Sequence, residues 1–170
     1  GVSLICYVDP KDSWHMQRFY DDIEYGEELK YRKDGYVGFE LHYAKFGQQL
    51  PKWGIVPNKT KMFIPPTCLD HSLLPHFLRG WIDGDGNVYV AGTGARIVVA
   101  SGNRPSMEWF AESLRSLGYT GNVGVRGANS YSDNWVLYIG GARQVSQIAS
   151  LLMADSEFCM PRKWKTSSLY

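Results

Sequence analysis

Two closely spaced aspartates, Asp83 and Asp85, are the residues of this chain best suited to chemistry. They end an apolar stretch in which Leu74, Leu78 and Ile82 recur at the spacing of one helical face, so we expect a helix that ends beside the two acids. A carboxylate next to the unpaired carbonyls of a helix end attracts a hard divalent cation, which takes oxygen ligands and fills its remaining positions with water or phosphate. The spacing therefore indicates a metal site at the end of this helix.

Two glycines, Gly80 and Gly84, lie four residues apart on the same expected helix. Without side chains they let a second backbone approach closely, as small residues do where two helices pack tightly. We therefore expect another helix to pack here, with both aspartates at the C-terminal end of the pair.

The nonapeptide Leu78–Gly86 resembles the signature of the LAGLIDADG homing endonucleases, with both glycines and both aspartates of that motif in place. Upstream, Trp53–Thr60 and Phe63–Pro66 resemble the region that precedes the second motif in two-motif members, and Pro161–Lys165 resembles the family's basic closing segment. The resemblance covers essentially the whole chain. It implies an α+β LAGLIDADG homing-endonuclease fold that cuts long DNA sites with a divalent metal.

The resemblance also implies roles for the motif residues. Asp85 would ligate Mg²⁺ or another divalent cation together with the backbone at Gly84, and Asp83 would orient the helix end or a water. Gly80 and Gly84 would form the helix contact.

Two lysines, Lys59 and Lys163, occupy matching places in an internal repeat, at an offset of 104 residues. Earlier in the repeat the offset is 93 residues, and a longer loop around residues 128–133 accounts for the difference of about eleven. One interpretation makes the two lysines catalytic, as basic groups that stabilise the charge developing on the scissile phosphate. The other makes them phosphate contacts or helix caps, and the sequence favours neither.

The internal repeat is visible as an offset of 93 residues, which lays Ser13 on Ser106 and a first strand on residues 95–101. We expect two pseudo-symmetric αββαββα-type repeats, residues 1–66 and 67–170. By this offset the first repeat lacks its motif helix and first strand. We expect the second motif from a missing N-terminal segment, a second chain or a homodimer.

Alternating strands predict the face that meets DNA. Val37, Phe39 and Leu41 alternate with polar residues, so one face of such a sheet is apolar and the other polar. A two-stranded β-ribbon fits the major groove of B-DNA, where polar side chains distinguish base edges. The candidate DNA-binding residues are Arg32, His42, Arg96, Arg126, Asn129, Tyr131 and Asn134.

Other motifs explain the same residues less well. The run from Asp83 begins like a calcium-binding loop, but Val88 stands where that loop needs glycine and Gly94 where it needs glutamate. Residues 92–97 carry two glycines of a dinucleotide loop without the third, which favours a hairpin turn.

Composition bounds the class of protein. With 170 residues, 44% hydrophobic and 14% aromatic, the chain buries a substantial core and is not disordered. It shows no run of transmembrane length and no signal peptide, so we expect a soluble, intracellular protein of the cytoplasm, nucleoid or an organelle matrix. Its three cysteines lack metal-ligand spacing and are expected to be buried free thiols.

We therefore expect a site-specific endonuclease of double-stranded DNA, a metal-dependent phosphodiester hydrolase associated with intron or intein mobility. The alternative is a cleavage-deficient nucleic-acid-binding protein on the same fold, either an intron RNA maturase or a DNA-binding regulator. An intein's endonuclease domain is a third possibility, although these residues include no splicing segments.

Overall fold

The computed structural model describes residues 4–23, 28–42, 44–57, 62, 65–66, 68–91, 94–129, 132–156 and 158–164. The chain divides into two units, residues 1–51 and 52–170. The division at 66/67 that the sequence suggested lies in a stretch of which only part is described.

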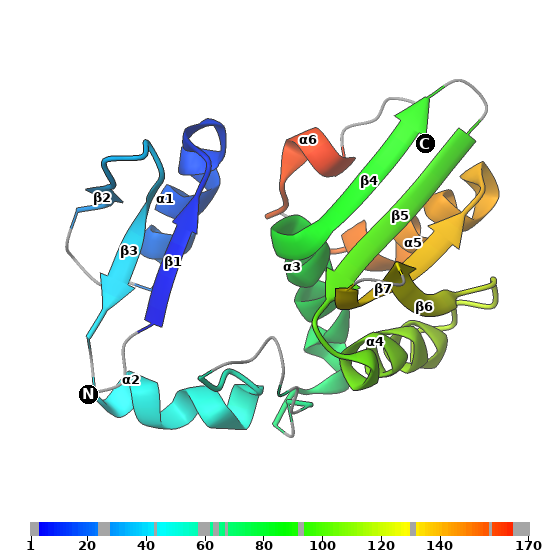
Figure 1. Cartoon of the computed structure of the whole chain (residues 1–170), viewed down its shortest axis with the longest axis horizontal. Coiled ribbons are helices and arrows are strands. Elements are labelled where there is room, and N and C mark those ends of the chain that lie inside the picture. Colours follow the sequence, from blue (N-terminus) through cyan, green and yellow to red (C-terminus); the bar gives the residue numbers. More distant parts are fainter. Residues whose placement is uncertain are drawn as a thin grey trace. The chain divides into compact units, whose positions relative to one another are not determined.

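The second unit is a four-stranded antiparallel sheet with three main helices on one face (Figure 1). The strands run in the order β4-β5-β7-β6. They comprise β4 (Gly86–Ala91), β5 (Gly94–Ser101), β6 (Gly124–Asn129) and β7 (Ser132–Gly140). The helices are α3 (Leu74–Asp85), α4 (Arg104–Ser116) and α5 (Ala142–Met153), followed by the short α6 (Pro161–Trp164). The apolar stretch thus forms a helix that ends at Asp85, as predicted.

Alternation along the strands separates the two faces of this sheet. In β5, Ala95, Ile97 and Val99 are buried, whereas Arg96 between them is exposed. The buried set joins the apolar sides of all three helices in one core, which includes Leu78 from α3 and others from α4 and α5. Period-two alternation puts the remaining strand residues on the opposite face, away from the helices, and we call it the outer face.

The first unit has a smaller sheet in the order β1-β3-β2. Its elements are β1 (Leu4–Val8), η1 (Pro10–Asp12), α1 (Ser13–Asp22), β2 (Lys30–Tyr31), β3 (Val37–Leu41) and α2 (Ala44–Gln49), and the 3-10 helix η2 (Leu50–Trp53) follows. Met16 and Tyr20 of α1 pack with Phe39 and Leu41 of β3, and this confirms the predicted apolar face of that strand.

The two units share one plan. Adding 93 to the bounds of β1 gives 97–101, which lies within β5, and adding 93 to those of α1 gives 106–115, which lies within α4. The order β1-β3-β2 likewise matches β5-β7-β6. Among its described residues the first unit shows no counterpart of α3 and β4.

Two further features concern the class of protein. No helix in the described part of the chain is both long and apolar enough to cross a membrane. Cys6, Cys68 and Cys159, all three within the described residues, form no disulfide bond. The expectation of buried thiols is wrong for Cys68, which is exposed, and the other two are half-buried.

Candidate functional site

The end of α3 leads tightly into β4. A side chain at Gly86, the first residue of β4, would place its Cβ 2.7 Å from the Ile82 carbonyl oxygen, closer than atoms in contact allow. Glycine at this position therefore lets the strand turn back against the last turn of the helix. This turn holds Asp85 at the junction of helix and sheet.

Asp83 is a buried anchor of the helix end, only 3% exposed. Its Oδ1 accepts a hydrogen bond from Trp164 Nε1 at 2.6 Å, and its Oδ2 accepts one from the Met160 backbone N–H at 3.1 Å. Both donors belong to residues 160–164, so this carboxylate ties the motif helix to that part of the chain.

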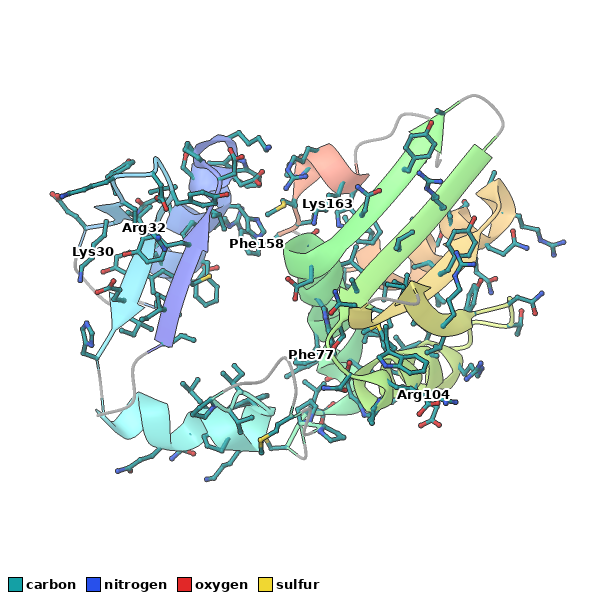
Figure 2. All side chains as sticks on the ribbon, viewed as in Figure 1. Lys30, Arg32, Phe77, Arg104, Phe158 and Lys163 are labelled. Carbon is teal, nitrogen blue, oxygen red and sulfur yellow. The ribbon has the colours of Figure 1, made fainter. Side chains whose placement is uncertain are left out.

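Lys163 caps the same helix end and is only 5% exposed. Its Nζ donates to the carbonyls of Ile82 at 2.8 Å and Gly86 at 2.7 Å, and also to that of Asp83. Figure 2 shows Lys163 beside the end of α3 and the start of β4. An ammonium has three protons, which match these three acceptors, and a cation is favoured at the negative end of a helix dipole. Of the roles considered for Lys163, this geometry is that of a helix cap.

Arg79 is a third buried polar side chain, after Asp83 and Lys163, and its role was not predicted from the sequence. Its Nε donates to the Phe158 carbonyl at 2.9 Å and its Nη1 to the Leu152 carbonyl at 2.8 Å, while Nη2 lies 2.9 Å from His76 Nδ1. Burial lowers the pKa of Arg79 and the nearby Asp83 opposes that shift, yet an arginine stays charged at any physiological pH. The opposite charges of Arg79 and Asp83, four residues apart on α3, were the signal in the sequence that could have revealed it.

Asp85 differs from Asp83 because it is exposed. No residue in the described part of the chain donates a hydrogen bond to its carboxylate or forms an ion pair with it. Gly80 and Gly84 are also exposed, and a Cβ built at either one would meet nothing within 4 Å. Asp85 and the glycine strip are therefore open to groups outside the described residues.

Aromatic side chains flank the glycine strip on α3. Phe77 lies with its ring centroid 5.6 Å from that of Trp109, and Trp81 lies 5.5 Å from Phe110. These rings are packed against α4, so the apolar face that we expected beside the glycines is partly covered within the unit.

The outer face of the second sheet carries three of the predicted DNA-binding residues. Arg96 lies over the Tyr89 ring at 4.7 Å and Arg126 over the Tyr138 ring at 5.7 Å, and Asn134 is exposed on β7. Two other predicted positions are not placed: the side chain of Asn129 and the whole of Tyr131 lie outside the described residues, as does Lys59.

In the first unit, Arg32 and His42 are exposed but already have acidic neighbours. Arg32 forms an ion pair with Asp34 at 2.9 Å, and His42 Nε2 lies 3.6 Å from a Glu40 oxygen. The Tyr7 hydroxyl donates to Glu40 at 3.0 Å. That hydrogen bond is the largest of the effects that lower the pKa of Glu40, followed by those of Lys30. The surface around Arg32 and His42 is thus less cationic than the outer face of the second unit.

Comparison with known proteins gives the second unit its family. A family model described as a LAGLIDADG-like domain matches residues 73–152, which run from the start of α3 almost to the end of α5. Residues 73–152 form a LAGLIDADG-like domain. The LAGLIDADG resemblance predicted from the nonapeptide is thereby confirmed for these residues.

The fold of the LAGLIDADG-like domain recurs in a solved structure. The crystal structure of the N-terminal LAGLIDADG domain of DUF199/WhiA matches with a TM-score of 0.58 and 12% identity, covering 88% of this chain and 72% of that chain. At this identity the match shows the fold alone, and it confirms the predicted α+β architecture. No curated protein matches the sequence. A LAGLIDADG-like domain fits a nuclease or a nucleic-acid-binding role.

The donor atoms at the end of the LAGLIDADG motif suit a hard cation. The Asp85 carboxylate and the adjacent Gly84 carbonyl are oxygen donors of the kind that Mg²⁺ prefers. Among the described residues, no cluster of three or more His, Cys, Asp or Glu side chains could hold a metal. These two residues would therefore supply only part of a cation's oxygen ligands, and the rest would come from water, phosphate and a second carboxylate.

Proposed function

We propose that this chain acts as a site-specific endonuclease of double-stranded DNA that hydrolyses phosphodiesters with Mg²⁺. The observation that carries the proposal is the contrast between the two motif acids. Asp83 is buried and takes two hydrogen bonds from residues 160–164, whereas Asp85 is exposed and engaged by no described residue. A carboxylate at a helix end that the fold does not use is available for a ligand.

Different residues of the chain would bind the cation, support the helix end and contact a second helix. Asp85 and the Gly84 carbonyl would hold the cation, which when bound supplies Lewis-acid activation of a phosphate and a water. Lys163 and Asp83 fix the helix end from which both ligands project. The open strip at Gly80 and Gly84 would receive a second motif helix carrying the other acid.

DNA binding would use the outer face of the second sheet. Arg96 and Arg126 both lie there, away from the helices. The half of the sequence that contains this sheet, residues 71–170, has nine Lys and Arg against seven Asp and Glu. A cationic, exposed sheet face attracts the phosphate backbone and can reach base edges in the major groove.

The second candidate is a nucleic-acid-binding protein without cleavage, either a maturase or a DNA-binding regulator. One observation favours it, because the described residues supply only part of a metal shell. It predicts the same outer-face binding and no role for Asp85.

Cleavage of a randomised duplex pool tests the proposal. Wild-type protein in Mg²⁺ should release cut ends that sequencing maps to a consistent site, and EDTA should prevent this. Asp85→Asn should abolish cutting while duplex binding in a gel shift stays within about tenfold, since the side chain keeps its shape but loses its charge. The control Asp155→Asn, at another exposed aspartate, should cut like the wild type.

Each result separates the candidates. Binding without cutting by the wild type would support the second candidate. Undiminished cutting by Asp85→Asn would overturn the metal-ligand role. The absence of any duplex DNA binding would overturn the endonuclease and the DNA-binding regulator, and would leave the maturase alone.

A further inference from the structure

Arginine guanidinium groups stack on aromatic rings at four places in the described residues. The pairs are Arg32 with Tyr7, Arg96 with Tyr89, Arg104 with Trp135, and Arg126 with Tyr138, at 4.7 to 5.7 Å from the ring centroids. A stacked guanidinium keeps its N–H donors around its edge, free to bind an acceptor in its own plane.

Acidic neighbours divide these four arginines into two classes. Arg32 is bound by Asp34 at 2.9 Å, and Arg104, labelled in Figure 2, is bound by Glu108 at 2.6 Å. Arg96 and Arg126 have no carboxylate partner among the described residues. Their donors are therefore available to an outside acceptor.

The two available arginines lie on the same face of one sheet. Arg96 is paired across the sheet with Tyr89 on β4 and Gly140 on β7, and Arg126 on β6 is paired with Val136. All the arginine and tyrosine side chains of both stacks are exposed.

Glycine makes room for one of these stacks. A Cβ at Gly140 would lie 2.8 Å from the Tyr138 ring, so any other residue here would displace the ring from its place under Arg126. The same glycine is the cross-strand neighbour of Arg96. Both guanidinium groups thus lie over tyrosine rings. Gly140 beside them carries no side chain, so a second molecule can approach the sheet closely there.

We propose that Arg96 and Arg126 each read a guanine in the major groove, and that the duplex target contains two guanines about five base pairs apart. This inference rests on the proposed DNA-binding function. Arginine matches guanine because its planar fork donates two parallel hydrogen bonds to O6 and N7, which no other base offers together. The tyrosine rings pre-order the guanidinium groups and so reduce the entropy lost on binding.

The strand register gives the spacing. Arg126 is opposite Val136, which is opposite Ala100, and Ala100 is four residues along β5 from Arg96. Four residues span about 13 Å along the strand, and the step from β5 across β7 to β6 spans about 10 Å. These two perpendicular distances give a separation of about 16 Å between the Cα atoms of Arg96 and Arg126. At a rise of about 3.4 Å per base pair this corresponds to about five base pairs.

Binding-site selection from a randomised duplex pool tests the inference without requiring cleavage. The wild-type chain should enrich sites with two guanines four to six base pairs apart, and replacing either guanine should weaken binding about tenfold or more. Arg96→Ala should erase the preference at one of these positions and Arg126→Ala at the other. Both residues are exposed, so the variants should melt at the wild-type temperature. The control Arg104→Ala, which removes an exposed arginine that also lies over an aromatic ring but is ion-paired with Glu108, should leave both preferences intact.

The outcomes distinguish the inference from the function on which it rests. Enriched sites without such a guanine pair, or unchanged preferences in both variants, would overturn guanine reading while duplex binding stands. No enrichment of any duplex would overturn the DNA-binding function and the inference with it.

Discussion

Replacing Lys163 by methionine separates its two possible roles. The methionine retains the apolar stem but removes the ammonium that donates to the carbonyls of Ile82, Asp83 and Gly86. Because Lys163 is only 5% exposed, water cannot replace these hydrogen bonds. Losing a buried cation that makes three hydrogen bonds costs about 3 to 5 kcal/mol, because all three carbonyl acceptors are left unsatisfied. For a unit of this size, that loss corresponds to a melting temperature lower by roughly 10 °C or more.

Urea-induced unfolding followed by tryptophan fluorescence measures this effect, because five of the six tryptophans lie in the second unit. The matched control is Lys52→Met in the same unit, which changes an exposed lysine and should alter stability by less than about 0.5 kcal/mol. If Lys163→Met unfolds like the wild type but loses DNA binding or cleavage, Lys163 contacts phosphate and the capping argument is wrong.

Two further substitutions test other parts of the account. Gly80→Leu should stabilise the isolated chain by about 0.5 to 1 kcal/mol, because leucine favours a helix and a Cβ there meets nothing within 4 Å. In sedimentation the same change should weaken self-association or pairing with a second motif helix, and unchanged association would refute the role of the glycine strip. In the first unit, the lowered pKa of Glu40 means that its contribution to stability is complete above its ordinary value of 4.5 and is lost as the pH falls through the folded-state value. Tyr7→Phe should therefore flatten the loss of stability below about pH 4.5 in acid unfolding, and an unaltered acid limb would show that the Tyr7 hydrogen bond is not its cause.

Local patterns in the sequence predicted most of the elements. The spacing of Leu74, Leu78 and Ile82 placed α3, and these three side chains are buried in the core. Alternation in β3 placed the buried and exposed faces of its sheet, and β5 follows the same alternation. These signals work because burial of one face repeats every two residues in a strand and about every 3.6 in a helix.

Contacts between distant residues could not be read in the same way. Asp83 and Trp164 are 81 residues apart, as are Ile82 and Lys163, and no period links such pairs. Spacing alone therefore could not separate the two motif acids, and only the family resemblance gave them different roles. In the structure Asp83 is an internal anchor and Asp85 is exposed. Arg79 was the exception that could have been found, because a charge four residues before Asp83 interrupts an apolar helix.

The arginine and tyrosine stacks also depend on register. The sequence singled out Arg96 and Arg126, but only the pairing of β4 with β5 and of β6 with β7 brings tyrosine rings beneath them. That register decides which face each side chain occupies, because a slip of one residue exchanges the two faces of a strand.

The central claim is that Asp85 is a metal ligand whereas Asp83 is not, and binding of Mn²⁺ in place of Mg²⁺ tests it most directly. Titrating Mn²⁺ into the ¹⁵N-labelled chain should broaden the amide signals of Gly84, Asp85 and Gly86 most strongly, because a bound paramagnetic ion relaxes nearby nuclei. The broadening should disappear in Asp85→Asn and persist in Asp155→Asn. Broadening centred elsewhere, or equally strong at these amides in Asp85→Asn, would contradict the account.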